Sequence, residues 1–187
     1  MRLKVLRPSQ YAWFIRPFFW RQRRKYGAIL DAALLWGRSP RLFAGVAILY
    51  GMIDRRRSPI EPALRSLVTV LVSQINHCSF CVDINSATLL KRGVPMEKVD
   101  ALETWTDSSL FNSRERAALD YADAVTRYDR GVDDDVFATL KSHFSEDEIV
   151  ELTGLIAFQN MSSKFNSALD VPAQGFCRMN ADAIERK

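Results

Sequence analysis

EPALRSLVTVLVSQINHCSFCVDINSATLLKRGV, residues 61–94, is the stretch of sequence that decides the fold. Its first half carries apolar residues at the spacing of one face of an α-helix: Leu64, Leu67, Val68, Leu71, Val72 and Ile75. The β-branched residues also suit a strand, but a run of this length is long for one. The second half ends on a basic turn and Gly93, which is typical of a helix C-terminus. The stretch therefore predicts a core helix that ends near Asn76, a cysteine pair, and a second helix.

The sequence on either side of this stretch is also helical in pattern. Upstream, KYGAILDAALLWG (25–37) predicts a short helix, and Ser39-Pro40 predicts the start of another that runs to Ile53. Downstream, a short helix is expected over 96–105 and an amphipathic helix over 133–143. Two capping boxes, Asn112 with Glu115 and Ser145 with Glu148, predict the starts of two longer helices. We find no strand signal, so the expected fold class is all-α.

Length and composition indicate one ordered domain. The chain has 187 residues, of which 48% are hydrophobic, and it has no long linker rich in Pro, Gly or Ser. We expect residues 1–57 to form a basic N-terminal helical extension packed on a helical core of residues 58–187.

The net charge of +4 hides an asymmetry, because residues 1–57 hold thirteen Lys and Arg residues against only Asp31 and Asp54. Within this region, residues 11–25 mix aromatic and basic side chains. These could contact a membrane surface or a nucleic acid. Alternatively, the aromatic rings cover the core or a neighbouring subunit while the basic groups reach water. We favour the second interpretation and expect neither nucleic acid nor membrane as a partner.

No segment reads as an export signal or a membrane span. The apolar run YAWFIRPFFW (11–20) is interrupted by Arg16 and Pro17. The uncharged stretch Leu42–Ile53 is far shorter than the ~20 residues that a bilayer requires. A cytoplasmic protein is expected, and in a reducing cytosol a close cysteine pair is more often redox-active or metal-binding than structural.

Cys78 and Cys81 are spaced so that their side chains share a helix face and can form a reversible disulfide. At a helix N-terminus, unpaired N–H groups favour the thiolate that a nucleophilic cysteine needs. A lone CxxC motif fits two small buried residues about equally well. Zinc fits poorly, because there is no second CxxC and His143 has no ligand partner at the usual spacing. We therefore expect no metal and no cofactor.

The stretch ALRSLVTVLVSQINHCSFCVDINSATLLKRGVPMEKVDAL resembles the carboxymuconolactone decarboxylase family, in its alkylhydroperoxidase D-like branch. The likeness continues through SRERAALDYADAVT and DDDVFATLKSHFSEDEIVELTGLIAFQN, so it covers roughly residues 60 to 170. The resemblance implies a helical bundle of the alkylhydroperoxidase D-like type that assembles as a trimer or hexamer. It also implies a peroxidase in which Cys81 attacks a small hydroperoxide, Cys78 resolves the product as a disulfide, and an external dithiol reduces it.

The chain departs from the family pattern where protons are handled. Family peroxidases usually have a histidine and a glutamate where this chain has Asn85 and Ser66. Asn85 can hydrogen-bond a thiolate one helical turn away, but it cannot take a proton. His77 could supply the missing imidazole, although a plain turn residue is the alternative. A carboxylate at Asp83 disfavours a second negative charge nearby.

Cys177 and the missing proton relay each suggest a further interpretation. Cys177, near the C-terminus, could meet the pair across a subunit boundary, but we expect a bystander thiol. Loss of the proton relay would also suit a binding or scaffold protein that kept the fold without efficient catalysis. Decarboxylation is not expected, because the lactone decarboxylases of the family lack the cysteine pair. A thiol peroxidase is the leading prediction.

Overall fold

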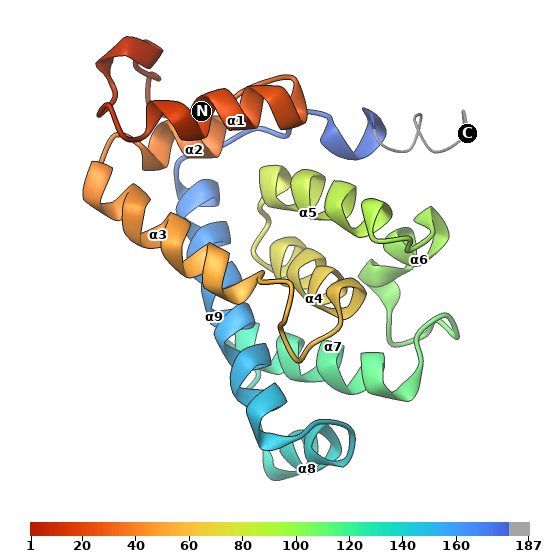
Figure 1. The fold of residues 1–187 in the computed structure, drawn as a ribbon. Coiled ribbons are helices and arrows are strands. Elements are labelled where there is room, and N and C mark those ends of the chain that lie inside the picture. The colour runs from red at the N-terminus through yellow and green to blue at the C-terminus, as the bar shows by residue number, and fades with distance from the viewer. Residues whose placement is uncertain (180–187) are drawn as a thin grey trace.

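The computed structural model describes residues 1–179, and within them every regular element is helical (Figure 1). The all-α prediction is therefore confirmed. The elements in chain order are η1 (Pro8–Gln10), α1 (Arg16–Tyr26), α2 (Asp31–Trp36), α3 (Pro40–Ile53), α4 (Pro62–Ile75), α5 (Ser79–Lys91), α6 (Met96–Asp100), η2 (Ala101–Thr104), α7 (Ser113–Thr126), α8 (Asp134–His143) and α9 (Glu146–Ala168). Every helix in this range is too short or too polar to cross a membrane.

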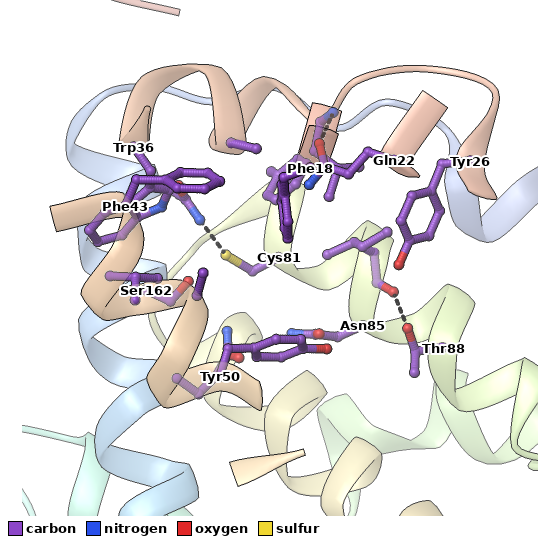
Figure 2. Close-up of a pocket in the computed structure, with 18 of the residues that line it drawn as sticks. Phe18, Gln22, Tyr26, Trp36, Phe43, Tyr50, Cys81, Asn85, Thr88 and Ser162 are labelled. Atoms are coloured by element: carbon purple, nitrogen blue, oxygen red, sulfur yellow. Dashed lines mark hydrogen bonds between the residues drawn. The ribbon is translucent and has the colours of Figure 1, made fainter. Parts of the chain in front are cut away.

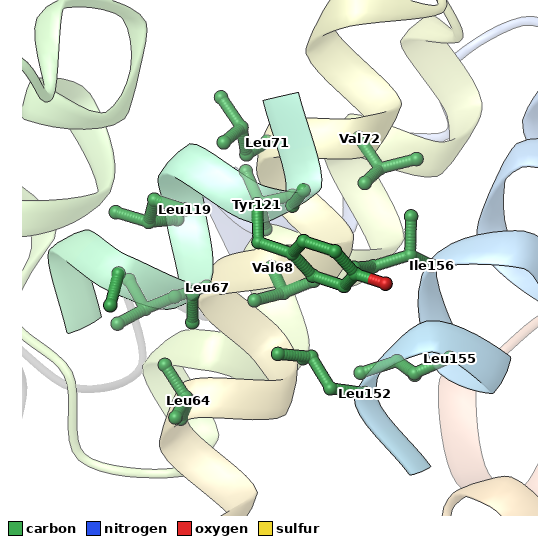
Figure 3. Close-up of a cluster of buried hydrophobic side chains, with 14 of the residues drawn as sticks. Leu64, Leu67, Val68, Leu71, Val72, Leu119, Tyr121, Leu152, Leu155 and Ile156 are labelled. Atoms are coloured by element: carbon green, nitrogen blue, oxygen red, sulfur yellow. The ribbon is translucent and has the colours of Figure 1, made fainter. Parts of the chain in front are cut away.

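Helix α4 is the centre of the core and packs against α5, α7 and α9. Its apolar face meets Leu119 and Tyr121 of α7 and the aliphatic residues of α9 around Ile156 (Figure 3). Leu67 and Val68 are fully buried. Because burying a Leu or Val side chain contributes roughly 1.5–3 kcal/mol, this face holds α4 in the interior of the fold.

Three helices begin where the sequence predicted, and two of them are capped by a side chain that accepts from free backbone N–H groups. Both capping boxes form: the Asn112 side chain accepts from the N–H of Glu115, and Ser145 accepts from the N–H of Glu148. Helix α3 begins at Pro40 as expected, although the Ser39 side chain makes no capping hydrogen bond.

The region 16–37 differs from its prediction. The sequence predicted one helix over 25–37 and treated the aromatic residues before it as an arm. Instead, α1 runs through that arm and stops at Gly27, whose φ of 78° is accessible to glycine at little cost. Helix α2 then starts only at Asp31.

Helices α1 and α2 lie over one end of α5 and α9, and α3 runs down from them along α9; together they form the N-terminal layer (Figure 1). Their inward residues make a second apolar cluster that includes Ile15, Phe19 and Trp36. Cys78 and Cys81 belong to this cluster and not to the core around α4. The cysteine pair therefore lies at the boundary between the N-terminal layer and the rest of the fold.

Residues 171–177, the C-terminal segment, tie these two parts together. The buried carboxylate of Asp83 on α5 accepts hydrogen bonds from the backbone N–H groups of Gln174, Phe176 and Cys177, at 2.9, 3.1 and 2.7 Å. The Gln174 side chain in turn accepts from the N–H of Asp31 at the start of α2, at 2.9 Å. The carboxylate that the sequence placed beside the thiols is thus used to hold the C-terminal segment.

Candidate active site

The cysteine pair lies at the start of α5, after a sharp turn. His77 adopts a left-handed backbone conformation, with φ of 51°, and turns the chain from the end of α4 into α5. Cys78 is the N-cap residue, and its sulfur accepts the N–H of Cys81 at 3.2 Å. The two cysteines form a disulfide with Cα atoms 5.2 Å apart, and each is only 2% exposed. The pair is therefore buried at a helix N-terminus, where the helix dipole favours a thiolate once the disulfide is reduced.

A cavity of about 310 Å³ lies between the N-terminal layer, α5 and α9. Within the described residues, Cys81 lines this cavity and Cys78 does not. Figure 2 shows the Cys81 sulfur between Phe18 on one side and Tyr50 with Asn85 on the other. Seven of the lining residues are aromatic: Phe18, Tyr26, Trp36, Phe43, Tyr50, Phe80 and Phe158. A small apolar or aromatic molecule in this space would reach one sulfur of the pair.

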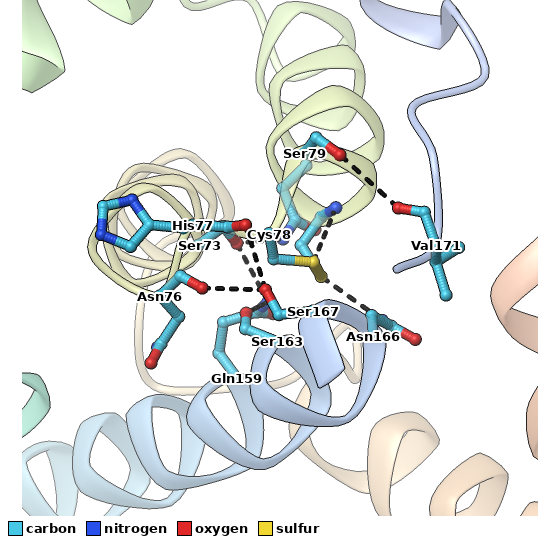
Figure 4. The surroundings of a disulfide bond; sticks show 12 residues. Ser73, Asn76, His77, Cys78, Ser79, Gln159, Ser163, Asn166, Ser167 and Val171 are labelled. Carbon is cyan, nitrogen blue, oxygen red and sulfur yellow. Dashed lines mark hydrogen bonds between the residues drawn. A yellow bond between two sulfur atoms is a disulfide. The ribbon is translucent and has the colours of Figure 1, made fainter. Parts of the chain in front are cut away.

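Beside the cysteine pair, the polar part of the site is a group of uncharged side chains. The Asn166 amide of α9 donates to the Cys81 sulfur at 3.3 Å. Asn85 and Gln159 both donate to the Ser73 hydroxyl, at 3.2 and 3.0 Å, and Gln159 also donates to Ser163 at 2.9 Å (Figure 4). These groups can form hydrogen bonds to a thiolate or to a polar substrate atom, but an amide acts neither as an acid nor as a base at neutral pH.

Asn166 has one feature that the others lack. It is 2% exposed, and its Oδ1 atom has no hydrogen-bond partner within residues 1–179. An unpaired buried acceptor is costly, typically by about 1–3 kcal/mol. A hydroxyl or hydroperoxide proton of a bound molecule would remove that cost.

Besides Cys78, two of the residues predicted for the site lie outside the cavity. Ser66 is buried on α4, where its hydroxyl accepts from Arg92 at 2.8 Å, and Arg92 also pairs with Asp54 at 2.7 Å. His77 is exposed, and its imidazole points away from the cysteines (Figure 4). The structure therefore brings Asn85 to the same cavity as Cys81, but neither Ser66 nor His77.

Cys177 is a separate thiol on the C-terminal segment. Its side chain is partly buried and packs against the core around α4. Burial, followed by the charges of Asp83 and Asp100, raises the pKa of the Cys177 thiol above its ordinary value. A raised pKa leaves less thiolate at neutral pH, which fits the bystander role expected from the sequence.

Partial desolvation, followed by the nearby charge of Asp54, raises the pKa of Tyr50 above its ordinary value. Tyr50 therefore acts in the cavity as a neutral hydrogen-bonding group.

Within residues 1–179, no three His, Cys, Asp or Glu side chains lie close enough together to hold a metal ion.

The sequence reading missed the residues that α9 supplies. Gln159, Ser163 and Asn166 continue the line of Leu152 and Ile156 along one face of the helix. Polar residues at buried positions of an otherwise apolar face are a signal for a site, because buried polar groups need partners.

The fold and the buried cysteine pair define an alkylhydroperoxidase D-like helical protein. The family model of the carboxymuconolactone decarboxylase family matches residues 40–124. YnjA of Escherichia coli K12, an uncharacterised protein, is 42% identical over 171 residues, which are 91% of this chain and 94% of YnjA. The chain belongs to the carboxymuconolactone decarboxylase family, so the resemblance seen in the sequence is confirmed.

Two solved structures extend the comparison. The debrominase Bmp8, as a cysteine-to-alanine variant in complex with 2,3,4-tribromopyrrole, has a TM-score of 0.82 at 24% identity and matches 98% of this chain and 97% of its own. ATU0492 of Agrobacterium tumefaciens, a protein of unknown function proposed to be the antioxidant defence protein AhpD, has a TM-score of 0.70 at 30% identity. It matches 74% of this chain and 94% of its own. The fold is thus shared along nearly the whole chain, including the N-terminal layer.

Proposed function

We propose that the protein is a dithiol oxidoreductase that reduces hydroperoxides, with Cys81 as the attacking residue and Cys78 as the resolving residue. The observation that carries this proposal is that the Cys81 sulfur lines the aromatic cavity while Cys78, already within disulfide distance, does not. The AhpD-like fold and family support the same assignment.

The reaction has two steps at sulfur. The Cys81 thiolate attacks the terminal oxygen of the hydroperoxide, the O–O bond breaks, and the alkoxide takes a proton and leaves as an alcohol. Cys78 then attacks the sulfenic acid on Cys81, the disulfide forms, and the hydroxyl group leaves with a proton as water. An external dithiol reduces the disulfide and is itself oxidised.

The structure supports a role in this sequence for two uncharged groups. The Asn166 amide, 3.3 Å from the Cys81 sulfur, stabilises the thiolate, and the unpaired Asn166 oxygen can accept a hydrogen bond from the hydroperoxide O–H. Asn85 and Gln159 also line the cavity, but their amide groups cannot deliver a proton to the departing alkoxide. Solvent or the Cys78 thiol supplies it, so we expect a slower peroxidase than one with a histidine relay.

The test uses the fully reduced protein and cumene hydroperoxide. Intact-mass spectrometry should show the loss of two hydrogens in the wild type. Cys78→Ser should stop at a sulfenic acid that dimedone traps, and Cys81→Ser should show neither product. Cys177→Ser is the matched control and should behave as wild type. If the wild-type mass stays unchanged while the cavity still binds ligands, the protein is a binding protein of this family and the peroxidase proposal is wrong.

A second candidate is reductive dehalogenation of a small aromatic molecule. It is favoured by the seven aromatic rings around Cys81 and by the likeness to Bmp8, which in its unliganded structure is 25% identical and matches 95% of this chain. Replacing an aromatic C–Br bond with C–H needs two electrons and releases bromide. The dithiol can supply both electrons by becoming a disulfide. Bromide release from tribromopyrrole by the reduced protein, absent in Cys81→Ser, separates this activity from peroxide reduction.

We also propose that the chain forms a homo-oligomer through α3 and α9. Ile48, Met52 and Val150 are 61, 62 and 71% exposed on these helices, and a shallow apolar groove lies between them. Exposed apolar patches of this kind mark protein interfaces. Sedimentation analysis of the wild type and of Val150→Glu tests this: the variant should shift toward the monomer, and a monomeric wild type would contradict the proposal.

A further inference from the structure

The charges around the cavity all have one sign. The charged residues that line it are Arg21 and Lys25, both exposed on α1 at the rim, and no carboxylate within residues 1–179 lines it. The remaining wall is apolar or carries neutral hydroxyl and amide groups. A small apolar space therefore opens beside two cations.

These two cations have no carboxylate of their own. Within the described part of the chain, neither Arg21 nor Lys25 forms an ion pair, whereas Arg55, Arg92 and Arg114 each do. Asp54, the carboxylate beside Tyr50, is already paired with Arg65 and Arg92, at 3.2 and 2.7 Å. The positive charge at the rim is therefore not neutralised inside the protein.

A third cation, Lys91 of α5, lies near Tyr26 although it does not itself line the cavity. The Lys25 ammonium lies 4.7 Å from the centre of the Tyr26 ring, and the Lys91 ammonium of α5 lies 5.7 Å from it. Tyr26 itself lines the cavity (Figure 2). The ring thus lies beside two ammonium groups, and an anion bound near it would be attracted by both.

We propose that the cavity binds an amphipathic anion of the carboxylate type. Its apolar body lies among the aromatic rings, and its head group lies against Arg21 and Lys25. Hydrogen bonds from cationic donors to a carboxylate are stronger than neutral ones, and a cleft lined by one sign of charge concentrates the opposite sign. The cavity volume of about 310 Å³ is near the lower limit for small-molecule sites, which fits a medium-length chain and not a long one.

Only the chemical step rests on the proposed function: a bound carboxylic acid with a hydroperoxide on its chain would present the hydroperoxide to the Cys81 sulfur. Binding itself needs only the cavity and its rim. The two claims can therefore fail separately.

The test is calorimetric titration of the full chain with decanoate and with decanol, which has the same chain length and no charge. Decanoate should bind about tenfold more tightly than decanol at low salt, and added salt should reduce the difference. Arg21→Gln and Lys25→Gln should each weaken decanoate binding about two- to fivefold, the range for exposed ion pairs, and should leave decanol binding unchanged. Arg23→Gln is the matched control, because Arg23 is exposed on α1 and does not line the cavity.

Equal affinities for decanoate and decanol, or equal effects of Arg21→Gln and Arg23→Gln, would overturn the inference. Competition gives the link to activity: decanoate should inhibit the reduction of cumene hydroperoxide competitively. Turnover without competition by decanoate would retain the peroxidase and reject the anion site. Charge-dependent binding without turnover of any hydroperoxide would retain the anion site and reject the peroxidase.

Discussion

Replacing Asn166 with alanine should make the reduced Cys81 thiol less reactive. The change removes the amide that donates to the Cys81 sulfur at 3.3 Å. A hydrogen bond to a charged group contributes about 1.5–3 kcal/mol, and we take the lower value because sulfur is a weak acceptor. A loss of about 1.4 kcal/mol lowers the thiolate fraction roughly tenfold. A more basic thiolate is also a better nucleophile, with a Brønsted coefficient of about 0.4–0.5, so the alkylation rate should fall only about three- to fourfold.

The assay is iodoacetamide alkylation as a function of pH, in a background where Cys78→Ser and Cys177→Ser leave Cys81 as the sole thiol. Serine is a good N-cap residue, so the start of α5 should be retained in this background. The alkylation curve of Asn166→Ala should move toward higher pH. Asn166→Asp, which keeps the side-chain shape but adds a negative charge, should move it further.

Ser162→Ala is the control for this experiment, because Ser162 lines the same cavity from the same helix without bonding Cys81. Its curve should overlay that of the parent. Overlaid curves for the parent and Asn166→Ala, or a shift of Asn166→Asp toward lower pH, would refute the claim that the Asn166 amide stabilises the thiolate.

Three further outcomes concern stability. Asp83→Asn should lower the free energy of unfolding by about 2 kcal/mol and Tm by about 4–8 °C. The reason is that a neutral amide replaces a carboxylate that accepts hydrogen bonds from three backbone N–H groups. An unchanged melting curve would contradict this. Leu67→Ala should cost about 2–5 kcal/mol in urea unfolding, with an unchanged m value, because Leu67 is fully buried in α4; a cost similar to that of an exposed leucine such as Leu42 would argue against the assigned core. A hydrogen bond from the Ser145 backbone N–H, together with Arg114, holds the pKa of Glu148 below its ordinary value. The Glu148 carboxylate therefore stabilises the fold above its pKa in the unfolded chain, and this stabilisation is lost as the pH falls through its pKa in the folded protein. Glu148→Gln should therefore be less stable than the wild type at pH 7 and equally stable near pH 2, and a gap independent of pH would exclude this role.

Local sequence signals predicted most of the fold. The α4 face, both capping boxes and the glycine after α5 are specified within a few residues of chain, and each appears as expected. The exception is α1. Its aromatic residues do not share one face, since Phe19 is buried while its neighbours Phe18 and Trp20 are 39 and 65% exposed. Only the packing of α1 over α5 and α9 decides which rings turn inward.

The candidate site was predictable only in part, for a related reason. Cys78 and Cys81 are close in sequence, so their spacing alone suggested a pair. The polar partner of Cys81 comes from Asn166, 85 residues away, and most of the aromatic wall comes from the N-terminal layer. Such contacts depend on tertiary packing and leave no periodic trace near the cysteines.

The order in which the site is assembled matters during translation. Cys78 and Cys81 leave the ribosome well before Asn166 and before Gln174, which bridges the C-terminal segment to α2. A nascent chain therefore carries two thiols without their final cover until its C-terminal part has been made. During that interval the pair is open to thiols and oxidants in the surrounding solution.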